Sequence, residues 1–355
     1  MKETIADVLN KINLFKLFKY YFLALLIFDI SHQSYSQDKS DLSTYPGKWI
    51  YTNNNLSGEW FGERYYKMTA TELQKYHSTT EKLVNYLHQQ PVAQNPLGVT
   101  LNAQARCSYI HYDHDKLSAA TERVKAEIYI PFCYFYEKNG KIDYSCMEVS
   151  NIKLRTNAIT CAFESIGRNF SGNNQVLKDY HDLFILRKKL LDLGSGVFLY
   201  DGYYTNFIIV ASNERPLWSP VTIREYTNKF MAYLIASTKE SNSSEELQQE
   251  VLDAFKKEIA DIPSELMSQN AYTNGNPLRP LTGICTMEED STSAIYKINP
   301  NYFDPSLPRT AVQLITISIE GHADDPDWGG ISAHRVWEFI QGMKGSDLKK
   351  LLDIN

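Results

Sequence analysis

Several features of membrane and nucleic-acid-binding proteins are missing from this sequence. After residue 37, no apolar run reaches the roughly 20 residues that a membrane-spanning helix needs. Like charges form no block, and the net charge of −6 gives no basic footprint for nucleic acid or for an anionic membrane surface. We therefore expect no transmembrane segment after the N-terminal region and no nucleic-acid partner.

Catalytic motifs with a fixed spacing are missing as well. The sequence contains no G-x-S-x-G, H-E-x-x-H, P-loop, G-x-G-x-x-G or C-x-x-C pattern. Catalytic triads are defined by geometry rather than by spacing, so these absences leave open whether the protein is an enzyme.

The first 36 residues differ from the rest of the chain and have the three parts of a secretory signal. A positive leading region carries Lys2, Lys11, Lys16 and Lys19. An apolar run follows at residues 20–30, and Ser34 and Ser36 then place small residues where a signal peptidase inspects the chain. The run is too short to span a membrane and contains Asp29 near its end. We predict cleavage near Ser36 and a periplasmic or secreted product in a Gram-negative envelope.

Two alternatives exist for this N-terminal segment, a retained anchor and an amphipathic helix of a cytosolic protein. Residues 22–28 contain no polar stripe, which argues against the amphipathic helix. No cysteine follows directly after the apolar run, so lipid attachment at that point is excluded.

The composition is that of a globular protein, with 43% apolar and 22% charged residues. The length after the signal suits one large domain or two small ones. The 24 tyrosines fit both β-sheets and glycan-binding surfaces, and composition does not separate the two.

Five cysteines are present, an odd number that leaves at least one thiol free or paired between chains. Two of them flank Asn139-Gly140, the preferred core of a two-residue type I′ hairpin turn. With that turn, Cys133 lies opposite Cys146 at a non-hydrogen-bonded position, where Cα atoms are about 4.5 Å apart, within the disulfide range. We predict a cross-strand disulfide if the protein is exported; the alternative is two small side chains packed as neighbours. A structural role without a defined partner is the default for Cys107, Cys161 and Cys285.

Hydrophobic periodicity and capping boxes at Thr69 and Thr222 predict a mixture of helices and strands. Helices are expected at residues 69–89, 175–193, 222–236, 247–259 and 333–343. Strands are expected at residues 99–112, 123–136, 141–156, 281–287, 294–298 and 311–319. A second hairpin spans residues 197–210 around Asp201-Gly202, with Tyr200 opposite Tyr203. Because hairpins imply antiparallel pairing and no regular βαβ alternation is present, we predict an α+β fold of antiparallel meanders and hairpins packed against helices.

The order of elements suggests two α+β units after a signal peptide at residues 1–36. We place the N-terminal unit at residues 37–160 and the C-terminal unit at residues 161–355. The two halves have a similar order of elements without a clear repeat of residues, so duplication is only a suggestion.

Two stretches of the chain resemble segments of known proteins. They are residues 216–226 (PLWSPVTIREY) and residues 299–309 (NPNYFDPSLPR). Both are similar to segments in uncharacterised exported proteins of Bacteroidetes-type bacteria. The resemblance implies the compartment, and no assigned active site comes with it.

The best candidate for a metal site is the loop that carries His322, Asp324 and Asp327. Imidazole and carboxylate groups bind divalent metals, and loops at strand ends are common places for sites. His334, in the next element, could join them. The alternative is a turn rich in Asp, whose carboxylates complement the dipole of the following helix. A second candidate, more simply a solvated strand end, contains His111, Asp113 and Asp115.

The third candidate is a group of aromatic side chains. Tyr200, Tyr203 and Tyr204 crowd the tip of the second hairpin, and Trp218 follows soon after. Exposed rings at a loop tip can stack on sugar rings or on a partner protein. The alternative is a tyrosine ladder across a half-buried sheet.

These features lead to three functional hypotheses. The leading one is a non-enzymatic binding or assembly protein of the envelope, whose partner is a protein, a glycan or an apolar small molecule. The second is a metal-dependent hydrolase, the one case that needs a cofactor, a divalent metal held by His322, Asp324 and Asp327. The third is a soluble carrier that holds an apolar ligand between sheet and helices.

Overall fold

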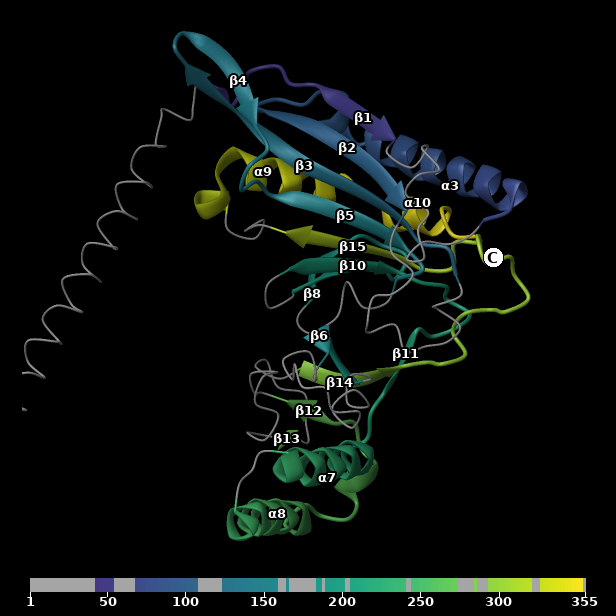
Figure 1. Cartoon of the computed structure of the whole chain (residues 1–355), viewed down its shortest axis with the longest axis vertical. Helices are drawn as coiled ribbons and strands as arrows, with labels where there is room; N and C mark the ends of the chain where they lie inside the picture. Colours follow the sequence, from purple (N-terminus) through teal and green to yellow (C-terminus); the bar gives the residue numbers. More distant parts are fainter. Residues whose placement is uncertain are drawn as a thin grey trace, which may run out of the picture.

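The computed structural model describes residues 42–53, 68–107, 123–158, 164–165, 183–186, 189–201, 205–240, 244–273, 284–285, 293–320 and 326–353. Within these residues the chain forms a nine-stranded sheet, a six-stranded sheet and the helices that pack on them (Figure 1). This architecture confirms the α+β fold class predicted from the sequence.

The large sheet joins strands from both ends of the described chain. Its order is β1 (Trp49–Asn53), β2 (Val99–Cys107), β3 (Ala126–Lys138), β5 (Asn151–Thr156), β15 (Ile315–Glu320), β10 (Asn206–Val210), β9 (Phe198–Tyr200) and β8 (Lys189–Asp192). A further strand, β4 (Lys141–Ser145), pairs with β3, and β1 is parallel to β2 while the other pairs are antiparallel. Strands from both sides of residue 160 therefore share this sheet, and the division expected at that residue does not separate the two sheets.

Helices cover one face of the large sheet. They are α3 (Ala70–His88), α4 (Pro91–Gln94), α9 (Pro326–Gln341) and α10 (Gly345–Lys349). Because strand side chains alternate between faces, every second residue of β3 meets these helices, namely Ile128, Ile130 and Phe132, all fully buried. The ring of Phe132 lies 5.6 Å from that of Phe339 on α9, edge to face. The residues between them belong to the opposite face.

The small sheet packs against a pair of helices. Its order is β13 (Ile284–Cys285), β12 (Tyr272–Thr273), β14 (Ser293–Ile298), β7 (Leu183–Leu186) and β6 (Glu164–Ser165), and β11 (Trp218–Pro220) also pairs with β14. The helices α7 (Ile223–Glu240) and α8 (Glu245–Ala260) share a core in which the rings of Phe230 and Phe255 are 5.0 Å apart. A short 3₁₀ helix, η3 (Leu266–Ser268), follows α8.

A second apolar cluster joins the two sheets. Tyr200 and Phe207, on β9 and β10, pack with Leu217, Ile298 and Tyr302. The Tyr302 hydroxyl donates a hydrogen bond to the backbone carbonyl of Gln313 at 2.6 Å and accepts one from the backbone N–H of Ser212 at 3.2 Å. Through this cluster, Tyr200 and Phe207 of β9 and β10 are connected to Ile298 of β14 in the small sheet.

The predicted helix caps are present in one complete and one partial form. At α3 the Glu72 backbone N–H donates to the Thr69 hydroxyl at 3.3 Å, and the Glu72 carboxylate accepts from the Thr69 backbone N–H at 2.8 Å. At α7 the Glu225 backbone N–H donates to the Thr222 hydroxyl at 3.2 Å. The Glu225 carboxylate instead pairs with Lys297 of β14 at 2.7 Å, so a charged partner on the sheet replaces the second half of the box.

The helix predicted at residues 175–193 is wrong over its described part. Residues 183–186 form strand β7, and residues 189–192 form strand β8. Their ladders with β14 and β9 override an apolar spacing that also suited a helix. Gly194, expected as a helix C-cap, has a φ of +82° and lies in the turn from β8 to β9, where the Leu193 N–H donates to the Val197 carbonyl.

The predicted register of the second hairpin is also wrong. Tyr200 pairs with Phe207 rather than with Tyr203, so the loop between β9 and β10 is longer than a two-residue turn. Phe207 also pairs with Ser318 of β15, and this ladder fixes the register of β10 independently of the turn. The strand expected at residues 141–156 is divided into β4 and β5, and the left-handed Glu148 (φ +51°) lies in the break.

Candidate functional site

The hairpin of β3 and β4 extends the large sheet beyond its neighbours (Figure 1). The first part of β3 pairs with β5, and its last part, from Tyr134 to Lys138, pairs with β4. Lys138 lies opposite Lys141, and Asn139 and Gly140 between them have φ values of +55° and +71°. This geometry confirms the type I′ turn and the register predicted from Asn139-Gly140.

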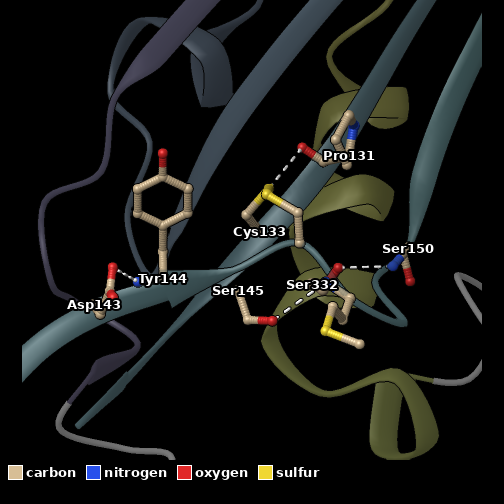
Figure 2. The surroundings of a disulfide bond; sticks show 9 residues. Pro131, Cys133, Asp143, Tyr144, Ser145, Ser150 and Ser332 are labelled. Carbon is tan, nitrogen blue, oxygen red and sulfur yellow. Dashed lines mark hydrogen bonds between the residues drawn. A yellow bond between two sulfur atoms is a disulfide. The ribbon is translucent and has the colours of Figure 1, made fainter. Parts of the chain in front are cut away.

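A disulfide closes the base of this hairpin. Cys133 and Cys146 are bonded, with their Cα atoms 4.3 Å apart, as the register predicts. Figure 2 shows Cys133 beside Tyr144 and Ser145 of β4, with Ser332 of α9 close by. The Ser332 hydroxyl accepts a hydrogen bond from the Ser150 backbone N–H at 2.9 Å. The hairpin is therefore fixed at its base both by a covalent link and by a contact with helix α9.

Exposed apolar side chains lie on the hairpin and beside it. The described residues contain five large hydrophobic side chains that are exposed, and four of them are Tyr45, Ile142, Tyr144 and Met147, the last 75% exposed. The ring of Phe135 lies 4.8 Å from Tyr45 and 6.4 Å from Tyr144. We call Tyr45, Phe135, Ile142, Tyr144 and Met147 the hairpin patch. The rings of Tyr45, Phe135 and Tyr144 form one aromatic group, and exposed apolar groups of this kind are typical of contact sites on protein surfaces.

A charged cluster lies on the face of the large sheet away from the helices. The Glu127 carboxylate, only 2% exposed, accepts from the Nε atoms of Arg106 and Arg155, each at 2.5 Å. On the same face, Lys153 pairs with Glu320. We call Arg106, Glu127, Tyr129, Lys153, Arg155 and Glu320 the charged cluster.

Tyr129 lies between two cations of this cluster. The Arg106 guanidinium carbon and the Lys153 Nζ lie 5.9 Å and 5.7 Å from the centre of its ring. Burial, and next the Glu320 carboxylate, raise the pKa of the Tyr129 hydroxyl. Burial alone would raise the pKa of Glu127, but the charges of Arg155 and Arg106 outweigh it and lower that pKa.

A polar groove of about 860 Å³ lies between α3 and the C-terminal helices. Its walls carry charges of both signs, and several are already paired with protein atoms. The Tyr51 hydroxyl donates to Glu81 at 3.0 Å beside the groove, and the Lys82 ammonium donates to the Lys350 carbonyl at 3.0 Å. Lys350 and Asp347 of the same walls pair with each other at 2.7 Å, so several of the groups that line the groove already have protein partners.

The structure brings together two of the predicted aromatic residues, but in the interior. Tyr200 is only 8% exposed; its ring stacks on Phe207 at 5.5 Å and lies 6.5 Å from Trp218. The expectation of an exposed Tyr200 at a loop tip is therefore wrong, because β10 pairs further along and draws Tyr200 into the cluster between the sheets. Tyr203 and Tyr204 lie outside the described residues.

The predicted metal ligands fall largely outside the described residues. His322 and Asp324 are not among them, nor are His111, Asp113 and Asp115, and Asp327 is the second residue of α9. His334 is exposed on α9, with its Nε2 3.2 Å from a carboxylate oxygen of Glu338. In the part of the chain that the structure describes, no three His, Cys, Asp or Glu side chains are grouped to hold a metal. The metal site at His322, Asp324 and Asp327 stays a prediction.

The sequence reasoning missed the charged cluster. Its members lie on four strands, and no short motif connects them. The available signal is alternation, since polar residues at positions 102, 104 and 106 of β2 alternate with buried apolar ones, and Lys153 and Arg155 do the same on β5. This pattern marks a second, polar face without saying which strands are neighbours.

Among the described residues, no helix combines the length and apolar content needed to cross a bilayer. Comparison with family models, with curated proteins and with solved structures finds no match in any of the three. The functional argument therefore rests on the chain's own residues, and the resemblance to exported Bacteroidetes-type proteins stays a prediction.

Proposed function

We propose that this chain is an exported, non-enzymatic binding or assembly protein of the cell envelope, which contacts a partner protein through the hairpin patch. The observation that carries the proposal is the exposure of Ile142, Tyr144 and Met147 on or directly after a hairpin that a disulfide closes. The exposed Tyr45 packs against Phe135 of the same hairpin.

The disulfide supports the exported location. Cysteines in the bacterial cytosol are kept reduced, whereas disulfides form and persist in the periplasm and outside the cell. Cys133 and Cys146 also follow a segment with the three parts of a secretory signal. Mass spectrometry of the purified native protein tests this point: we expect a chain that begins close to Gln37, and retention of Met1 on a cytosolic protein would contradict it.

The hairpin patch supports a protein partner. Ile142 and Tyr144 share one face of β4 with Phe135 on β3, and Lys141 and Asp143 occupy the other face. Aromatic and apolar side chains such as these are enriched at the centre of protein–protein contacts. The exposed side chains of the patch would be buried by such a partner.

The contact is expected through the apolar face of the hairpin rather than by addition of a strand to β4. The Asp143 carboxylate accepts the Tyr144 backbone N–H at 2.8 Å, so this donor is not free for a neighbouring strand. Charged side chains such as Lys141 and Asp143 also protect an edge strand from pairing. Side-chain packing of Tyr144 and Met147 then provides most of the contact.

Site-specific photo-crosslinking in the native host tests the proposal. Photoreactive p-benzoylphenylalanine in place of Tyr144 is expected to give one dominant adduct with a second protein. The matched control carries it in place of Ile235, an exposed hydrophobic residue of α7 that lies away from the hairpin. The adduct should disappear when Met147→Ser is added to the Tyr144 variant. Equal adducts at both positions, or none at position 144, would contradict a partner on the hairpin.

A further inference from the structure

We infer that the charged cluster is a binding site for a hydroxylated carboxylate of the sugar-acid class, held by Arg106, Tyr129 and Lys153. This site is separate from the hairpin patch and goes beyond the function proposed above. The argument starts from the register of the strands that carry these residues.

The sheet places the three residues side by side on one face. Gln104 of β2 lies opposite Tyr129 of β3, and Tyr129 lies opposite Lys153 of β5, so these residues form a row across the sheet. Arg106 belongs to the next row, opposite Glu127, and β2, β3 and β5 lie next to one another in Figure 1. Side chains two positions apart on a strand share a face, so both rows point away from the helices.

The cluster gathers three cations on one face of the sheet of an acidic protein. Arg106, Lys153 and Arg155 lie there together with the carboxylates of Glu127 and Glu320. The whole chain has a net charge of −6. The half-exposed Arg106 guanidinium favours an anionic ligand by charge complementarity.

Glu127 orients the arginine that would bind the ligand. The buried carboxylate holds Nε and Nη2 of Arg106, while the Arg106 side chain stays 51% exposed. Among the described residues, Nη1 of Arg106 makes no hydrogen bond, so it can donate to a ligand oxygen. A guanidinium held in one plane is a better partner for a planar carboxylate than a freely rotating one, because less side-chain freedom is lost on binding.

Tyr129 and Lys153 supply the remaining donors. The Tyr129 hydroxyl is a hydrogen-bond donor, as in any protonated tyrosine, and two cations flank its ring. Lys153 is paired with Glu320, whose side chain is 42% exposed. A ligand carboxylate can displace the Glu320 carboxylate and become the ion-pair partner of Lys153.

The surroundings of Asn151 indicate that the ligand carries hydroxyl groups. It lies on the same face of β5 and is 7% exposed, and its Nδ2 donates to Glu320 at 3.3 Å. Its buried Oδ1 has no hydrogen-bond partner among the described residues. Buried acceptors are nearly always satisfied in proteins, so this atom favours a ligand that also carries hydroxyl donors.

Calorimetric titration of the full mature chain with D-glucuronate tests the inference. We expect saturable binding that weakens about tenfold or more in Arg106→Gln, the usual effect of losing a hydrogen bond to a charged group. Arg106→Lys keeps the charge but loses the planar guanidinium. Its affinity for D-glucuronate should lie between those of the wild type and of Arg106→Gln. The matched control is Arg215→Gln, an exposed arginine in an ion pair with Asp304 away from this face.

Three results would overturn the inference. One is the absence of saturable glucuronate binding to the wild-type chain, and another is equal affinity in Arg106→Gln and Arg215→Gln while both keep the wild-type melting temperature. The third is equally strong binding of D-glucose or of sodium sulfate, which would remove the need for a carboxylate. The crosslinks at position 144 do not depend on Arg106, so failure here and failure of the hairpin proposal are distinguishable.

Discussion

Glu72 and Arg309 form an ion pair between residues 237 positions apart in the sequence. The Arg309 Nε and Nη2 atoms lie 2.5 Å and 3.0 Å from the two oxygens of the Glu72 carboxylate. The same carboxylate caps helix α3 through the Thr69 backbone N–H. One side chain therefore fixes the start of a helix and holds the loop that leads into β15 against it.

This double role predicts a pH-dependent contribution to stability. Hydrogen bonds from Arg309, and next from the Thr69 backbone, lower the pKa of Glu72 from 4.5 to about 2. Because the folded-state pKa is depressed, the stabilisation is fully present above pH 4.5 and is lost as the pH falls towards 2. Urea unfolding of Glu72→Gln at neutral pH should show a loss of about 1 kcal/mol, the upper end for a partly exposed ion pair.

The pH series separates this effect from a general loss of stability. The difference between wild type and Glu72→Gln should shrink between pH 4.5 and pH 2, where the wild-type carboxyl takes up its proton. The matched control is Glu250→Gln, on the exposed face of α8. A difference that stays constant down to pH 2 would show that Glu72 acts only through packing.

The disulfide gives a second prediction. Peptide mapping without reductant should find Cys133 linked to Cys146, and Cys133→Ser with Cys146→Ser should lower the free energy of unfolding by about 3 kcal/mol, as expected for a short closed loop. The Asn139-Gly140 turn should survive, since its ladder does not need the covalent link. Recovery of both cysteines as singly alkylated peptides from the native protein would contradict the bond.

The core beneath the large sheet gives a third prediction. Phe339→Ala on α9 removes a fully buried ring that packs against Phe132, and should cost about 3–5 kcal/mol of unfolding free energy. Ile235→Ala, at an exposed position of α7, should cost less than about 1 kcal/mol. Chemical denaturation measures both. A loss below about 1 kcal/mol for Phe339→Ala would place this ring outside the core.

The features that the sequence predicted correctly depend on neighbours along the chain. The Asn139-Gly140 turn fixes its own geometry, and the opposition of Cys133 and Cys146 follows by counting outward from it. The cap at Thr69 is equally local. Asp201-Gly202 carried the same kind of signal and failed, because the ladder between β10 and β15 decided the register there.

The candidate sites were less predictable because they depend on distant pairing. The charged cluster exists only because β2, β3, β5 and β15 are neighbours in one sheet. Nothing near Arg106 in the sequence indicates that Glu127 and Arg155 will face it. Part of the hairpin patch could be predicted from the sequence, because the register that gave the disulfide also placed Tyr144 opposite Phe135. The exposure of these side chains could not be predicted, because it depends on which elements cover them.

The position of β15 has a consequence for how the chain acquires its fold. This strand lies between β5 and β10 in the middle of the large sheet, yet the ribosome makes it after every other described strand. Until it emerges, β5 and β10 lack a neighbour on that side, and the two flanks of the sheet cannot be joined. Because the strand between β5 and β10 is synthesised last, the large sheet cannot be completed until translation is almost finished.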